Sequence, residues 1–243
     1  MANLRRIFLF VASIALVLTS TGCISNSVPR ARLAGVQKIG VVIATDQAMH
    51  AICVGTTVFN NEKWDAPEVP LDTHRWIREE FQAADPALFK IFENTPKTAG
   101  VLANSYQPSF LVPARPSAEE LKRFGATEGV QLVVVLTSGQ AGDFMGQTSA
   151  SLPCHGYYHR SIFGMHFDFA YFTSEVRVFD ARDGEAISDS SAIGFGTLKD
   201  MAWEKSWVEL SPANQAAVKE KVEASTHAAI ATKIKELELA AHP

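Results

Sequence analysis

The pattern of apolar and polar residues predicts an ordered series of strands and helices from about residue 34 onward. Two apolar runs rich in β-branched residues, at 38–44 and 51–59, have the length and composition of buried strands. Residues 45–50, between them, have the length of a hairpin connection. Residues 60–70 carry two prolines and two adjacent asparagines, which interrupt the pattern.

A first helix is predicted to begin after Asp72, a residue type that caps helices. Leu71 and Trp76 have the spacing of a hydrophobic staple across this cap. Apolar residues then recur at helical spacing up to residues 85–86, an Asp-Pro pair where the helix is expected to end and a second helix to start. Residues 94–116 contain short apolar pieces among prolines and give only a weak strand signal.

A capped helix followed by a buried strand sets the predicted fold class. Ser117 and Glu120 form a capping box at the start of a short helix, which is expected to stop within residues 125–129. The next run, 130–136, is almost continuously apolar, so it needs cover on both faces and belongs at the centre of a sheet. This succession predicts one α/β domain with a mixed sheet in two or three layers, with α+β as the alternative.

The C-terminal part predicts a hairpin and a closing helix. Residues 138–164 contain five glycines and several small polar residues, and we interpret them as a long loop. Residues 167–179 and 185–196 have strand composition on either side of a turn signal, which indicates an antiparallel hairpin. Ser211 and the proline after it begin a helix whose apolar side is expected to pack on the sheet.

The first 23 residues form a segment of a different kind. Arg5 and Arg6 precede an uncharged apolar run at 7–18, and small residues lead from there to Cys23. This is the anatomy of a secretory signal, and the apolar run is shorter than the roughly 20 residues that span a bilayer. Because it ends at a cysteine, the segment resembles a bacterial lipoprotein signal, although Ser20 stands where that family prefers an aliphatic residue. An ordinary signal peptide cut nearby is the alternative.

The resemblance implies that Cys23 becomes the lipid-modified first residue of the mature protein, carrying palmitate or similar acyl chains as its membrane anchor. It divides the chain into a signal peptide (1–22), a lipidated tether (23–33) and a single periplasmic domain (34–243). Ile24 stands where the Gram-negative family places aspartate for retention in the inner membrane. This residue favours the inner leaflet of the outer membrane, if the source is Gram-negative.

Composition excludes one class of partner and supports a single large domain. Removing the signal peptide takes away Arg5 and Arg6 and no acidic residue, so the formal net charge moves from −4 to −6. A mildly acidic domain does not fit nucleic acid, which selects basic surfaces. The 47% apolar composition supports a substantial core. No glycine motif of a nucleotide site and no hydrolase elbow around Ser138 is present, so we expect no cofactor.

Cys53 and Cys154 remain as an even number of cysteines once Cys23 is acylated. A disulfide between them is one prediction in an oxidising compartment, and two separately buried thiols are the alternative. A metal-binding or reactive role for Cys154 is a third. His155 and His159, with His166 and Asp168 beyond them, are weaker candidates for a metal site. Their spacing matches no standard zinc motif.

Tyr157, Tyr158 and Arg160 belong to an aromatic-rich region and are a candidate partner surface, because tyrosine and arginine are enriched where proteins bind. Core packing of the same residues is the alternative.

The order of elements, with the lipoprotein-type signal, loosely resembles the small α/β domains of envelope accessory lipoproteins, such as activators of peptidoglycan synthases and assembly lipoproteins of secretion systems. The resemblance implies a non-enzymatic domain that binds another envelope protein. The alternative function is a small-ligand or metal-binding protein, or a hydrolase, that uses residues 138–168.

Overall fold

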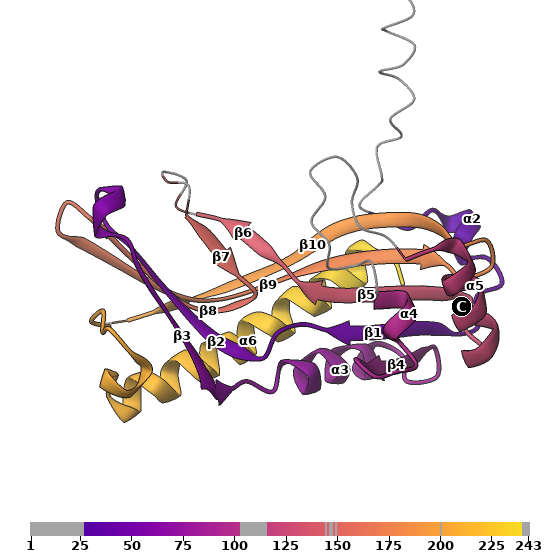
Figure 1. The fold of residues 1–243 in the computed structure, drawn as a ribbon, viewed down its shortest axis with the longest axis horizontal. Coiled ribbons are helices and arrows are strands. Elements are labelled where there is room, and N and C mark those ends of the chain that lie inside the picture. The colour runs from indigo at the N-terminus through magenta and orange to yellow at the C-terminus, as the bar shows by residue number, and fades with distance from the viewer. Residues whose placement is uncertain are drawn as a thin grey trace, which may run out of the picture.

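The computed structural model describes residues 27–102, 116–143, 145, 148, 150–199 and 201–239. Over these ranges the chain forms a long mixed sheet with helices packed on its faces (Figure 1). The predicted α/β class is therefore confirmed, together with the late hairpin and the closing helix. The signal peptide and Cys23 lie outside the described residues. No helix of the described part is both long and apolar enough to cross a membrane.

The strands are β1 (Ile39–Ala44), β2 (Ala48–Val54), β3 (Glu62–Pro70), β4 (Phe89–Glu93), β5 (Leu132–Ser138), β6 (Gln140–Gly142), β7 (Ser151–Pro153), β8 (His155–Ile162), β9 (Met165–Asp180) and β10 (Glu185–Leu198). The helices are α2 (Arg30–Leu33), α3 (Thr73–Ala84), α4 (Ala99–Leu102), α5 (Ala118–Glu128) and α6 (Pro212–Glu236), with 3-10 turns η1 (Val58–Asn60) and η2 (Trp207–Glu209).

The hairpin of β9 and β10 joins two groups of strands. β10 pairs with one edge of β9. Along the opposite edge, the first half of β9 pairs with β8 and the second half with β5. β2 and β3 extend the sheet beyond β8, while β1 and β4 extend it beyond β5. β6 and β7 form a separate two-stranded sheet.

Around β1 and β5 the fold has three layers. Apolar residues on one face pack against α3 and α6, including Phe81 and Ile230. Residues on the other face pack against α4 and α5, including Leu121 and Phe124. Both central strands are buried along nearly their whole length, as the continuous apolar runs predict.

Around β2 and β8 the two faces are covered differently. The first half of α6 and residues 201–210 cover one face, with Trp76 and Trp207 in the same cluster. The β6–β7 hairpin covers the other face through Leu152, which packs on Tyr158 and Tyr171. Strand β8 therefore has no solvent-facing side along most of its length.

The local capping signals form as predicted, with one exception. Ser117 Oγ accepts a hydrogen bond from the Glu120 backbone N–H at 3.2 Å, and Ser211 Oγ accepts one from Asn214 at 3.2 Å. Asp72 precedes α3, but its side chain accepts from Arg75 at 3.4 Å and bonds no helix N–H.

The hairpin connection predicted between the first two strands is wrong. β1 pairs with β4 and β5, whereas β2 pairs with β3 and β8 in the other half of the sheet. Residues 45–47 therefore carry the chain between the two halves. The two strands pair with different neighbours because β1 requires covering helices on both faces of the sheet, whereas β2 does not.

Two further predictions in this region are corrected. Residues 62–70 form β3 despite their prolines, because this strand lies at the edge of the sheet, where a missing N–H is tolerated. After the Asp-Pro pair, Asp85 Oδ1 accepts hydrogen bonds from Ala87 and Leu88 backbone N–H groups at 2.8 and 3.0 Å. This turn leads into β4, not into a second helix.

The long loop predicted at residues 138–164 is also wrong, because most of the segment forms β6, β7 and β8. The glycines and small residues of this segment obscure the apolar periodicity of a strand, but its β8 part pairs with β2 and β9. The alternating pattern His155, Tyr157, His159 belongs to a strand covered on both faces.

The folded domain starts earlier than the predicted boundary at residue 34. Val28 and Leu33 are buried in the main core, although both lie in the range assigned to the tether. Arg32 of α2 bonds Asp180 at 3.1 Å and also pairs with Asp183 and Glu185. The helix α2 is thus attached to the turn between β9 and β10.

Candidate functional site

The predicted partner surface is not on the surface. Tyr157, Tyr158 and Arg160 are all buried, because β8 lies inside the sheet between β2 and β9. Successive side chains of a strand point to opposite faces, so Tyr157 and Tyr158 enter two different clusters. The core-packing alternative is the one that the structure supports.

Beside Trp203, a buried carboxylate connects β8 and β9. Asp168 Oδ1 accepts a hydrogen bond from Tyr157 Oη at 2.6 Å and lies 2.7 Å from His159 Nδ1. The ring centroid of Trp203 lies 5.7 Å from that of Tyr157 and 6.0 Å from that of His159. Burial, with the Asp168 hydrogen bond, raises the pKa of Tyr157 well above its ordinary value, so Tyr157 remains a donor. This network satisfies polar groups inside the fold.

A second buried carboxylate holds the β6–β7 segment to the opposite face. Asp143 accepts hydrogen bonds from Tyr158 Oη and Thr148 Oγ1, both at 2.7 Å. Burial opposes ionisation of Asp143, but these hydrogen bonds keep its pKa below the ordinary value. Arg160 lies 3.9 Å from Asp143 and donates to the Gly55 carbonyl at 3.1 Å. The charged groups of this region therefore have structural partners.

The four weaker metal candidates do not converge on one point. His166 stacks on His159 with ring centroids 5.3 Å apart, and Asp168 faces both Tyr157 and His159. His155 is four residues from His159, about 13 Å along the strand. Within the described ranges, no group of three or more His, Cys, Asp or Glu side chains is placed to hold a metal ion.

The predicted disulfide is also corrected. Cys53 and Cys154 are both free and buried. Cys53 lies beside His159 in the ladder of β2 and β8, and Cys154 is five residues before His159, about 16 Å away at strand spacing. A disulfide needs Cα atoms within about 7 Å, so the separately buried thiols are the alternative that holds.

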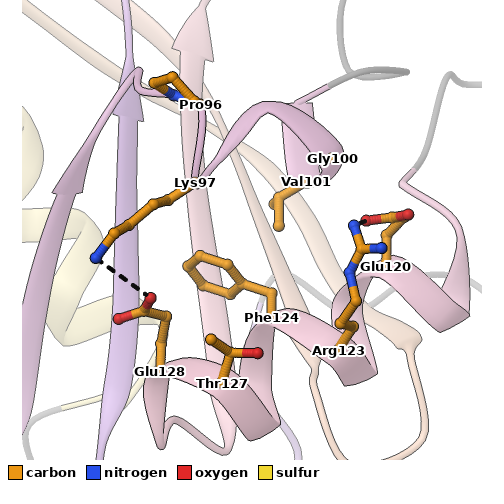
Figure 2. Close-up of a pocket in the computed structure, with 9 residues that line it drawn as sticks. All are labelled: Pro96, Lys97, Gly100, Val101, Glu120, Arg123, Phe124, Thr127 and Glu128. Atoms are coloured by element: carbon orange, nitrogen blue, oxygen red, sulfur yellow. Dashed lines mark hydrogen bonds and ion pairs between the residues drawn. The ribbon is translucent and has the colours of Figure 1, made fainter.

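A cavity of about 350 Å³ lies between α4 and α5 (Figure 2). Phe124 and Val101 form its apolar part. Lys97 Nζ lies 3.8 Å from Glu128, and Arg123 pairs with Glu120, so the charged side chains around the opening neutralise one another. The cavity has no unbalanced charge to select an ionic ligand, and we assign it no function.

Apart from Val208 in η2, the exposed large apolar side chains of the described residues lie in two places. The first, which we call the β10 patch, consists of Ile193 and Phe195, 51% and 58% exposed, and the adjoining Phe169. The Phe195 ring contacts Phe169 edge to face, with centroids 6.3 Å apart. The second, the loop tip, consists of Phe59, Phe163 and Met165, which are 93%, 84% and 56% exposed.

Tight packing against α6 dictates which side of β10 is exposed. A Cβ atom on Gly194 would lie 2.2 Å from the Ser225 carbonyl oxygen of α6, so no side chain fits there. The large neighbours Ile193 and Phe195 consequently point to the opposite face. The alternation of small and large residues at 192–196 is the sequence signal that could have revealed this patch.

The sequence matches no protein-family model and no curated protein. Among solved structures, it is similar to the hypothetical protein CT253 from Chlamydia trachomatis, with a TM-score of 0.41, 10% identity and coverage of 82% of this chain and 94% of that chain. It is also similar to the lipoprotein GNA1162 from Neisseria meningitidis, with a TM-score of 0.26, 8% identity and coverage of 68% and 87%. A third similar structure is the LpoB C-terminal domain from Salmonella enterica, with a TM-score of 0.24, 9% identity and coverage of 74% of this chain and 90% of that chain. Lipoproteins are therefore among the similar structures, but likeness at this level assigns no function.

Proposed function

We propose that this protein is a lipid-anchored cell-envelope protein whose domain is a non-enzymatic accessory that binds another envelope protein. Residues 1–23 support the anchor, which would attach Cys23 to the inner leaflet of the outer membrane in a Gram-negative source. Val28 is already buried in the domain. The stretch from Cys23 to Val28 reaches at most about 17 Å, so an acylated Cys23 would keep this end of the domain near the membrane.

The β10 patch is the observation that carries the binding role. β10 is an edge strand, and β9 is its one strand partner within the described part of the chain. An edge strand flanked by exposed apolar side chains is a template for an added strand from another protein. Hydrocarbon does not suit this surface, since lipid cannot satisfy the hydrogen-bonding groups of a strand edge. The patch therefore fits an extended segment of a protein partner that has apolar side chains on one face.

Site-specific photocrosslinking in cells tests the binding role. A benzophenone amino acid at Ile193 is expected to capture a discrete envelope protein. The same probe at Ala216, an exposed residue of α6, is the matched control and is expected to give no such adduct. Identical adduct patterns from the two positions, or no adduct from Ile193, would contradict binding through β10.

The anchor is tested separately by metabolic labelling with a fatty acid. The full chain is expected to incorporate the label, and Cys23→Ser is expected to lose it and to leave the membrane fraction. Labelling that persists in Cys23→Ser would show that the anchor was assigned to the wrong residue.

A further inference from the structure

The residues of the loop tip lie on or next to two chain reversals, which are side by side at one end of the sheet (Figure 1). One is the connection from β2 to β3, which contains η1 and Phe59. The other is the turn from β8 to β9, which contains Phe163. The last register pair of β2 and β8 joins Val54 to Arg160, and Thr56 Oγ1 then donates to the Ser161 carbonyl at 3.4 Å.

Phe163 is unfavourable for the isolated domain on two counts. Its side chain is 84% exposed to water. Its φ is +48°, and Gly164 after it has φ +80°, in the two-residue turn closed by the pair of Ile162 and Met165. Such turns favour Asn, Asp or Gly, and a bulky residue at positive φ is an outlier. Neither folding nor solubility explains a phenylalanine here, which points to a binding role.

The composition and hydrogen bonding of the loop tip permit it to leave water. Residues 55–61 and 161–167 contain no Asp, Glu, Lys or Arg. The Asn60 backbone N–H donates to the Thr57 carbonyl at 3.0 Å, and the Gly55 N–H donates to Asn61 Oδ1 at 3.1 Å. Backbone groups that are already bonded can approach hydrocarbon at far lower cost than open ones. This separates the loop tip from the β10 patch, whose strand edge requires a protein.

The position of the loop tip relative to the N-terminal end of the domain suggests a second contact with the same membrane. α2 is attached to the turn after β9, whereas the loop tip is at the start of β9, a strand of 16 residues or about 50 Å. Figure 1 shows both at the upper edge of the view, at opposite ends of the long axis. A bilayer that holds an acylated Cys23 can therefore also reach the two chain reversals at the other end of the sheet.

We propose that Phe59, Phe163 and Met165 insert into the boundary between headgroups and acyl chains of the bilayer that holds the anchor, so that the domain is attached at both ends. This inference rests on the lipid anchor of the proposed function. Apolar side chains on a narrow loop give weak membrane binding alone and effective binding when an anchor keeps them nearby.

A fluorescent probe near the loop tip tests the insertion. Met165→Cys is labelled with an environment-sensitive dye in the full mature chain. Cys53 and Cys154 are buried, and burial raises the pKa values of their thiols to about 11 and about 12, so both should react far more slowly than the introduced, exposed thiol. To make the test independent of acylation, Cys23→Ser is introduced and the chain is held by an N-terminal His tag on vesicles of phosphatidylethanolamine, phosphatidylglycerol and a nickel-chelating lipid.

Insertion predicts a blue shift of the dye on vesicle binding and quenching by nitroxide-labelled lipids. Both effects should be lost when Phe59→Ser and Phe163→Asn are combined, while the tagged protein still binds the vesicles. The same dye on Ala216→Cys, in α6, is expected to show no shift.

Water-like emission of the Met165→Cys probe on tethered vesicles would overturn the proposal. A shift that appears without vesicles as protein concentration rises would also overturn it, in favour of contact with a second copy. Failure of the anchor alone would appear differently, as absent fatty-acid labelling of Cys23 together with a normal shift in the tagged protein.

Discussion

Phe163 illustrates, at the scale of one residue, a conflict between the backbone and the side chain. Left-handed backbone costs most non-glycine residues roughly 1 to 2 kcal/mol, whereas asparagine tolerates it. We expect Phe163→Asn to raise the free energy of unfolding by about 1 kcal/mol, measured by urea denaturation of the mature chain. Phe163→Ala, which removes the ring without suiting the turn, should stabilise less. Destabilisation by asparagine would mean that the ring packs usefully in the free domain.

His155 is a second residue whose environment has a measurable consequence. It is buried at the start of β8, with its ring centroid 6.1 Å from that of His50. Burial, with the nearby His50 charge, lowers the pKa of His155 from 6.5 to about 4. The folded state therefore favours the neutral ring. Between pH 6.5 and 4 the unfolded chain binds a proton that the folded chain does not, so stability falls as pH decreases through this window.

We expect this proton to weaken folding by on the order of 3 kcal/mol between pH 7 and pH 4. His155→Phe, which cannot ionise, should reduce the loss of unfolding free energy over that interval. Urea denaturation at pH 7, 5.5 and 4 measures the difference. Parallel pH profiles for the two proteins would contradict this assignment.

At the scale of elements, α2 and the β9–β10 turn are held together by one buried carboxylate. Asp180 is 1% exposed and accepts hydrogen bonds from Arg182 Nε at 2.8 Å and Arg32 Nη1 at 3.1 Å. Burial opposes ionisation of Asp180, but the bonds from Arg182 and Arg32 keep its pKa below the ordinary value. The attachment of α2 therefore depends on a charged group that is costly to leave unpaired.

We expect Asp180→Ala to lower the free energy of unfolding by about 2 kcal/mol, because a buried carboxylate that accepts hydrogen bonds from two guanidinium groups is lost. Asp183→Ala is the matched control: Asp183 pairs with the same Arg32, but its side chain is 40% exposed, and its loss should cost at most about 1 kcal/mol. Equal losses would show that burial of Asp180 does not matter.

Elements also differ in how far their own sequence predicts them. The capped helices α5 and α6 and the β9–β10 hairpin follow from signals a few residues long. By contrast, β8 reads as a loop, because its tyrosines are mixed with histidine, arginine and serine. His159 bonds Asp168, and Arg160 lies near Asp143 and bonds Gly55, all on other segments of the chain. The polar groups of β8 could be judged as buried only after those neighbours were placed.

At the scale of the whole molecule, residues 28–33 belong to the core, which shortens the link to the proposed anchor at Cys23. We expect a chain that begins at residue 34 to be less stable than one that begins at residue 24 by about 4 kcal/mol, since it lacks the buried side chains of Val28 and Leu33. Thermal and urea unfolding of the two chains measure the difference. Equal stabilities of the two chains would indicate that residues 24–33 act only as a tether.

The two apolar surfaces have different roles in the proposed arrangement. The loop tip is narrow, lacks charged residues and has internally bonded turns, which suits lipid. The β10 patch lies beside an edge strand and suits a protein segment. Together with an acylated Cys23, they describe a domain held along a membrane with a strand available to a partner.

The α/β class, the central buried strand, the late hairpin and the closing helix can all be predicted from the sequence alone. These follow from side-chain periodicity and from caps such as Ser117 and Ser211, which act within one turn of the backbone. Other features became evident only from the three-dimensional fold: β1 and β2 pair in different halves of the sheet, Tyr157 and Tyr158 are core residues, Cys53 and Cys154 lie far apart, and Phe163 is exposed. Each of these depends on which distant strand lies alongside, and strand pairing is selected by the packing of the whole sheet and its covering helices.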